Sequence, residues 1–211
     1  MYNISDDDKE FETLLKDKLA DFEKDFDKNF FTQEATLELL SLGVNISDDL
    51  DYRSNRIVWN AACFINIASY DLKIIVKSMV FARREWEKRL FSRQASLLIY
   101  EVLNDIFELF GKEFRTVLAK LSDKEIFEQQ LKEIIRELNN YKTLYFDKLK
   151  QIRNISIAHR DQDTIEQLNA IKSISWVDSI NMVSEFDKIL NQIGKLLQKL
   201  ASKSKELDKL K

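Results

Sequence analysis

The chain has 211 residues, a formal net charge of −3, one histidine, one cysteine, three glycines and no proline. Parallel sheets, hairpins and sandwiches need turn residues far more often than this, so the composition excludes them and favours long helices joined by short connections. With 45% hydrophobic and 33% charged residues, the chain is globular rather than disordered. A lone cysteine offers no disulfide framework, which is typical of a reducing cytoplasm. We therefore predict an all-α, cytoplasmic protein of one domain, or of one domain with an appendage.

The charge is distributed unevenly along the chain. Residues 1–51 hold 15 acidic and 5 basic side chains, a net charge of −10, whereas residues 52–211 hold 21 acidic and 28 basic ones, a net charge of +7. A basic body suits a polyanion such as nucleic acid, but charged residues also coat the solvated faces of ordinary helices. The first residues lack the basic and apolar regions of a secretory signal. The sequence thus separates an acidic N-terminal region from a mildly basic body.

The acidic region, residues 1–51, is predicted to form a helical hairpin. Apolar residues at helical spacing predict a first helix from Ser5 to Phe26, with Ser5 as its N-cap. A second helix is predicted from Thr32 to Leu42, ended by Gly43 as its C′ residue. The polar residues 43–51 then form a loop, which is the predicted boundary with the body.

The body, residues 52–211, begins with an almost continuous helical pattern over residues 54–110. We predict two long helices there, with a junction near residues 81–85 and with Gly111 at the end of the second. The most apolar stretch, Ile57 to Tyr70, is interrupted by two asparagines and is too short to span a bilayer. No membrane contact is therefore predicted.

Two further long helices are predicted in the second half of the body. Ser122 and Glu125 have the spacing of a capping box, which opens a helix that runs towards residue 153 with a bend near Asn139. The last helix is predicted over residues 177–200. The lysine-rich end, residues 203–211, is predicted to fray.

One short segment combines side chains that suit phosphate chemistry. Arg153 is followed directly by Asn154 and, after five intervening residues, by His159, the only histidine in the chain. Arginine presents a planar set of donors that matches phosphate geometry and keeps its charge. Histidine has an unperturbed pKa of about 6.5, so it can act as an acid or a base near neutral pH. Any histidine-dependent proton transfer must therefore use His159.

This motif resembles the signature of the HEPN superfamily, in which an arginine is followed by Asn, Asp or His and, a few residues later, by a histidine. The resemblance implies a HEPN-like helical bundle over roughly residues 54–200, within the body of the chain. Many HEPN proteins are metal-independent endoribonucleases of toxin–antitoxin, phage-defence and RNA-processing systems, and others are non-catalytic. We accordingly expect an endoribonuclease in a toxin–antitoxin or phage-defence setting.

Each residue of the motif has an expected role in RNA cleavage. His159 would remove the proton of the 2′-hydroxyl or protonate the leaving 5′-oxygen. Arg153 would hold the scissile phosphate and stabilise the transition-state charge, and Asn154 would position the phosphate or orient His159. Arg160, directly after the histidine, would extend phosphate binding. The expected products carry 2′,3′-cyclic phosphate and 5′-hydroxyl ends, and no metal or other cofactor is expected.

The spacing of the motif also bears on the oligomeric state. On an ideal helix, six residues separate Arg153 and His159 by roughly 120° and about 9 Å along the axis, so the two do not share a face. Either a distortion near Asn154 or a second subunit must bring the groups together. HEPN ribonucleases typically place two motifs across a dimer interface, and twofold dimers are the commonest oligomers. The expected partners are RNA, a second copy bound through the motif face, and an antitoxin or regulatory protein.

Three alternatives remain open at the level of sequence. The chain can be a non-catalytic HEPN-type dimer that binds a partner protein. It can also be a structural bundle with an accidental motif, in which His159 caps the C-terminus of a helix. In the third alternative, the acidic hairpin shields the basic groove of the body from inside the same molecule.

Overall fold

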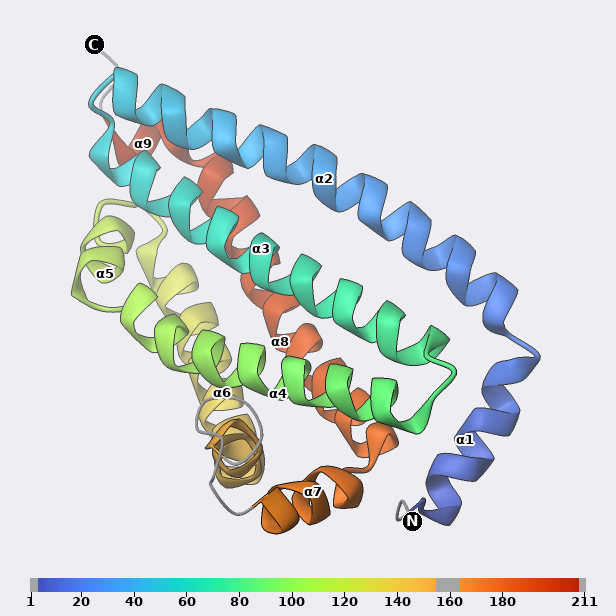
Figure 1. Cartoon of the computed structure of the whole chain (residues 1–211). Helices are drawn as coiled ribbons and strands as arrows, with labels where there is room; N and C mark the ends of the chain where they lie inside the picture. The colour runs from blue at the N-terminus through green and yellow to red at the C-terminus, as the bar shows by residue number, and fades with distance from the viewer. Residues whose placement is uncertain (1–3, 155–163, 209–211) are drawn as a thin grey trace.

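The computed structural model describes residues 4–154 and 164–208. Within these residues all regular structure is α-helical, which confirms the predicted all-α fold (Figure 1). The helices are α1 (Asp6–Lys16), α2 (Leu19–Asp49), α3 (Arg53–Phe81), α4 (Glu85–Leu109), α5 (Lys112–Leu118), α6 (Lys124–Arg153), α7 (Thr164–Ser173), α8 (Trp176–Ser202) and α9 (Ser204–Leu207).

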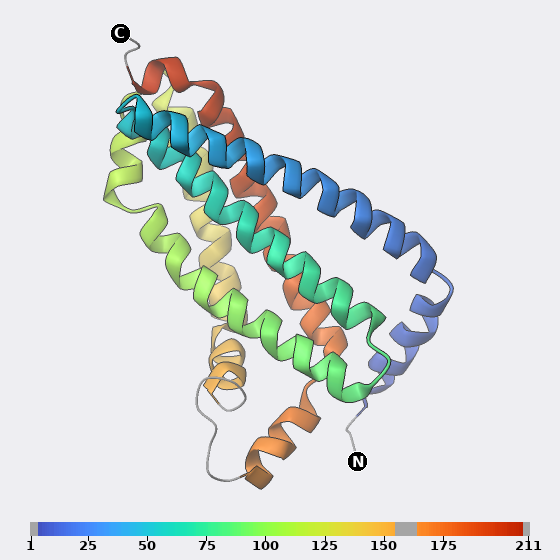
Figure 2. The same cartoon turned by 45° about the horizontal axis from the view of Figure 1, so that its top comes forward.

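Four long helices, α3, α4, α6 and α8, enclose the hydrophobic core. Helix α8 packs against the other three, and α4 lies between α3 and α6 (Figure 2). Apolar residues of α8 recur every three or four positions, so they form one buried side that includes Phe186, Ile193 and Leu197. Each such fully buried side chain contributes about 2 kcal/mol through the hydrophobic effect.

The predicted break between the two long helices of residues 54–110 is confirmed. Helix α3 ends at Phe81 and α4 begins at Glu85. The carboxylate of Glu87 accepts hydrogen bonds of 3.2 Å from the backbone N–H groups of Arg83 and Arg84. These bonds satisfy donors at the start of α4 that have no partner inside the helix, which stabilises the break at this point.

The predicted helix boundaries in the acidic region are wrong. The break lies at residues 17–18 instead of 27–31, and α2 continues through Gly43 to Asp49. The reason is tertiary packing, because a Cβ atom on Gly43 would lie 2.5 Å from Cδ2 of Trp59 in α3. Gly43 therefore allows the close approach of two helices and does not end one.

The two N-terminal helices pack on helices other than α6, the helix that ends at Arg153. Helix α2 lies along α3 at the outer edge of the molecule, and α1 packs against α8 (Figures 1 and 2). Arg153 lies instead at the end of α6, which packs against α4 and α8. The internal-shield alternative has no support at Arg153, and the rest of the motif lies outside the described residues. The division into two domains at residue 51 stays a prediction.

Helix α6 begins differently from the sequence prediction. Its N-cap is Asp123, without a side-chain capping bond, and the helix is continuous through Asn139 to Arg153. The hydroxyl of Ser122 donates a 2.8 Å hydrogen bond to Glu206 of α9. The predicted capping box with Glu125 is thus replaced by a contact with a distant segment.

The C-terminal segment is ordered through Asp208, contrary to the prediction that residues 203–211 fray. Leu207 of α9 is buried in the core. The carboxylate of Asp208 accepts hydrogen bonds from the backbone N–H groups of Ser54, at 3.3 Å, and Asn55, at 2.8 Å. Burial alone would raise the pKa of Asp208, but these hydrogen bonds lower it below its ordinary value. Asp208 therefore acts as the N-terminal cap of α3.

Replacement of Asp208 by alanine is expected to lower the free energy of unfolding by about 1 kcal/mol, the usual cost of losing a helix cap. The urea midpoint of Asp208→Ala, compared with that of wild type at pH 7, measures this loss. A midpoint equal to that of wild type would show that the C-terminal segment does not cap α3 in solution.

Candidate functional site

Arg153, the last residue of α6, is held by three neighbouring groups. Its Nε donates a 2.9 Å hydrogen bond to the carboxylate of Glu101 on α4. Its Nη1 donates a 3.3 Å bond to Oδ1 of Asn154. Its guanidinium carbon lies 5.1 Å from the centre of the Tyr100 ring, a cation–π contact. These contacts fix the position of the guanidinium, and within the described residues they use two of its five N–H donors.

Half-buried rings and cations form a row between α4 and α6 that ends at Arg153. The ammonium of Lys142 lies 5.2 Å from the ring centre of Phe107 and 4.7 Å from that of Phe146. Phe146 stacks on Tyr100 with ring centres 5.1 Å apart, and Tyr100 in turn supports Arg153. The row gives Arg153 a rigid base at the surface of the bundle, where its side chain is 30% exposed.

The structure describes only the first two residues of the motif, and the roles predicted for its residues stay predictions. Asn154 is the C-cap of α6, and its side chain contacts Arg153. Helix α6 ends at Arg153, and the chain from residue 155 to His159 lies outside the described residues. His159 and Arg160 lie outside the described residues. The structure brings together Arg153 and Asn154 and adds Glu101, to which sequence analysis assigned no role.

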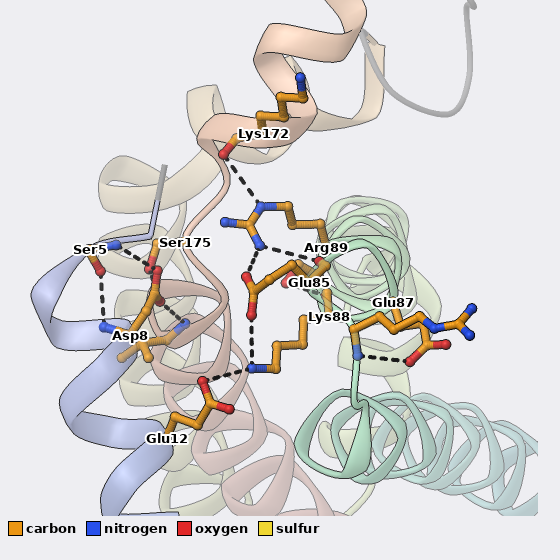
Figure 3. A network of polar contacts seen from close by, with 12 residues as sticks. Ser5, Asp8, Glu12, Glu85, Glu87, Lys88, Arg89, Lys172 and Ser175 are labelled. Atoms are coloured by element: carbon orange, nitrogen blue, oxygen red, sulfur yellow. Dashed lines mark hydrogen bonds and ion pairs between the residues drawn. The ribbon is translucent and has the colours of Figure 1, made fainter. Parts of the chain in front are cut away.

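Helix α4 also anchors the chain beyond the motif. Arg89 of α4 is fully buried, and its Nε donates a 3.4 Å hydrogen bond to the carbonyl oxygen of Lys172 in the last turn of α7. Its Nη1 donates to the carboxylate of Glu85 (Figure 3). Helix α4 therefore holds the chain at two places. Glu101 binds Arg153, which precedes residues 155–163, and Arg89 binds Lys172, which follows them.

A second buried cation joins the same cluster to α1. The ammonium of Lys88 lies 3.0 Å from Glu85 and 3.3 Å from Glu12 of α1, and its side chain is 5% exposed. It also lies 4.5 Å from the ring centre of Trp176, at the start of α8. Burial by itself would raise the pKa of Glu85, but the hydrogen bonds from Arg89 and Lys88 lower it below its ordinary value. Glu85 is thus charged at neutral pH and compensates two buried cations.

Helix α1 is attached to the start of α8 by one buried carboxylate. Asp8 accepts hydrogen bonds from the hydroxyl of Ser175, at 3.0 Å, and from the backbone N–H of Val177, at 3.2 Å (Figure 3). The same side chain completes the capping box of α1 with Ser5. Asp8 therefore caps two helices and fixes the N-terminal region to the end of the bundle that carries α7.

Two other features, a metal-binding cluster and a membrane-spanning helix, are absent from the described residues. They contain no group of three or more His, Cys, Asp or Glu side chains placed to hold a metal ion. Across the same residues, no helix is long and apolar enough to cross a membrane.

Glu101 is the residue of the site that sequence analysis missed. It is 52 positions from Arg153 in the chain, so no local pattern joins the two. The only signal in the sequence is a carboxylate beside the apolar stripe of the helix over residues 85–110. Because α4 packs against α6, that carboxylate forms an ion pair with Arg153.

Comparison with known proteins gives one match. The family model HEPN_AbiU2, described as AbiU2, matches residues 112–210, which contain α5 to α9 and the motif. The match begins later than the region of resemblance expected from sequence, although α3 and α4 pack against α6 and α8 in the same bundle. No curated protein and no solved structure matches the chain.

Proposed function

We propose that this protein is a metal-independent endoribonuclease that cleaves RNA by attack of the 2′-hydroxyl on the neighbouring phosphate, since residues 112–210 match the HEPN_AbiU2 family model. The observation that carries the proposal is the placement of Arg153. A partly exposed guanidinium is oriented by a carboxylate, an amide and an aromatic ring at the end of the helix that precedes His159.

The contacts of Arg153 suit a phosphate-binding role. Its ion pair with Glu101 joins two partly exposed side chains, and such pairs contribute about 0–1 kcal/mol. A phosphate can therefore compete for the guanidinium without a large cost. Arg153 would then bind the non-bridging oxygens and stabilise the charge that develops in the transition state. Glu101 is a positioning residue, since it holds Nε and directs the remaining donors away from α4.

Proton transfer is assigned to His159. As a base, its neutral form takes the proton of the 2′-hydroxyl, and as an acid, its protonated form gives a proton to the leaving 5′-oxygen. Asn154 would orient the phosphate together with Arg153, and Arg160 would bind an adjacent phosphate. The bond to the 5′-oxygen breaks as the bond to the 2′-oxygen forms, which yields a 2′,3′-cyclic phosphate and a 5′-hydroxyl.

The charges around Arg153 support a homodimer through the motif face. Helix α4 exposes Glu101, Asp105 and Glu108, and α6 exposes Lys132, Arg136 and Lys150 as well as Glu133 and Asp147. A twofold axis brings the same surface of both copies together. It would let the acidic residues of α4 in one copy meet the basic residues of α6 in the other and bring two motifs to one groove.

The biological setting that we propose is a cytoplasmic toxin–antitoxin or phage-defence system. In such a system the ribonuclease must be restrained until it is needed, which implies an antitoxin or regulatory protein as a further partner.

Cleavage of a mixed pool of tRNA and mRNA in the presence of EDTA tests the proposal. Wild-type protein is expected to give cyclic-phosphate ends, and His159→Ala is expected to cleave at least about 100-fold more slowly, because general acid–base catalysis contributes that much or more. Circular dichroism of both proteins controls for folding. Equal background cleavage by both proteins on all RNAs would favour a non-catalytic dimer instead.

A further inference from the structure

Helix α2 carries an unusual apolar stripe on its exposed side. Phe31, Leu39, Leu42, Ile46 and Leu50 are 77%, 60%, 53%, 45% and 53% exposed. At 100° per residue, these positions fall within about 100° of one another around the helix axis. Exposed apolar residues are ordinary when they are scattered, but a contiguous row of them marks an interaction surface.

A groove runs directly beside this stripe, between α2 and α8, with α3 as its floor. It has a volume of about 660 Å³, and Leu39 belongs to both the stripe and the groove. Small side chains line it, including Ala62 on α3 and Ala201 on α8. Grooves with small residues allow the backbone of a second helix to approach closely, and the apolar stripe would cover the outer side of that helix.

Gly194 leaves the α8 wall of the groove open. It lies in the interior of a 27-residue helix, where glycine is less favourable than alanine by about 1 kcal/mol. A Cβ atom at this position would meet nothing within 4 Å, so no packing inside the chain requires the glycine. This differs from Gly43, which the ring of Trp59 requires. Gly194 is one of the residues that line the groove.

The net charge of α2 favours basic side chains on the part of a ligand helix that lies along α2. The helix carries eight acidic and two basic side chains, a net charge of −6. Two of its carboxylates, Asp27 and Asp48, pair with cations of α3, but Glu38 lies at the edge of the stripe and is exposed. The α8 wall contributes a single lysine, Lys195. A ligand helix therefore needs an apolar face and basic residues on the flank that lies along α2.

We propose that the groove between α2 and α8 binds an amphipathic helix of a partner protein, with lysine or arginine residues beside its apolar face. Charge disfavours a second copy of this chain as the occupant, because two α2 helices of net charge −6 would face each other. This surface is separate from Arg153 and from the α4–α6 face, so the proposal does not depend on ribonuclease activity.

Two synthetic 20-residue helical peptides test the proposal. Both carry leucines at helical spacing on one face, and the flanks carry lysine in one peptide and glutamate in the other. Fluorescence anisotropy is expected to show salt-dependent binding of the lysine peptide to the full-length protein, and at least about tenfold weaker binding of the glutamate peptide. Equal affinity for the two peptides, or no binding of either, would overturn the proposal.

Two variants locate the binding site. Gly194→Leu fills the groove and is expected to weaken binding of the lysine peptide about tenfold, without lowering the melting temperature. Leu39→Gln removes an anchor of the stripe and is expected to weaken binding to a similar degree. The matched control is Leu144→Gln on α6, since Leu144 is also an exposed leucine, and it should bind as wild type does. The proposal is overturned if all three variants bind equally, or if Leu39→Gln instead converts a dimer to a monomer in light scattering.

Discussion

Replacement of Arg153 by alanine is expected to lower RNA cleavage by about 1000-fold, the effect of removing a group that stabilises transition-state charge. The rate constant in single-turnover cleavage should fall more than the affinity for RNA, because Arg153 would bind the transition state more strongly than the ground state. The free energy of unfolding should change by less than about 1 kcal/mol, since the side chain is partly exposed and its ion pair is weak.

The matched control for this prediction is Arg53→Ala. Arg53 is also ion-paired with a glutamate, Glu113 of α5, but both side chains are more than three-quarters exposed and neither contacts Arg153. It should cleave RNA at the wild-type rate. If Arg53→Ala and Arg153→Ala lose activity equally, the loss reflects general charge and not a site at Arg153.

The role of Glu101 can be separated from that of Arg153 by a double-mutant cycle. Glu101→Gln keeps the shape of the side chain but removes the charge that holds Nε of Arg153. We expect about a tenfold fall in the rate constant in wild type and no further fall in the Arg153→Ala background. Additive effects in the two backgrounds would mean that Glu101 does not act through Arg153.

The largest effect on stability is expected for Glu85→Gln. The change removes the carboxylate that faces two buried cations, Arg89 and Lys88. Both cations lose a shared carboxylate, although Lys88 keeps its ion pair with Glu12, and breaking one side of a buried charge cluster costs about 3 kcal/mol. Urea unfolding at pH 7 measures this loss. The control Glu113→Gln, in an exposed pair, should change stability by less than about 0.5 kcal/mol.

The same substitution predicts a change in pH dependence. Hydrogen bonds from Arg89 and Lys88 outweigh burial and hold the pKa of Glu85 below its ordinary value of 4.5. A carboxyl with a depressed pKa in the folded state contributes stability above its unfolded pKa, and this contribution is lost as the pH falls through the folded pKa. The stability difference between wild type and Glu85→Gln should therefore shrink below about pH 4.5. A difference that stays constant to pH 3 would contradict this assignment.

In the N-terminal region, local sequence patterns predict the helical character of the chain but not the boundaries of its helices. Its helical character follows from apolar spacing, and the structure has helices there. The boundaries, however, depend on Gly43, which is a good helix terminator by itself and is instead required by the ring of Trp59. Likewise, Ser122 has the spacing of a capping box but bonds to Glu206, 84 residues away. Local propensity is worth about 1 kcal/mol or less per residue, so tertiary contacts override it.

Composition and helical periodicity alone predict an all-α protein, because periodicity and the near absence of turn residues act along the backbone. Residue type and spacing also single out Arg153 and Asn154 as candidates, within the region that matches the HEPN_AbiU2 family model. Only the tertiary structure decided that Glu101 and Tyr100 hold Arg153, that Arg89 holds the end of α7, and that α2 and α8 enclose a groove. These contacts join residues from about 50 to more than 150 positions apart, and the packing of helices, which no local pattern encodes, brings them together.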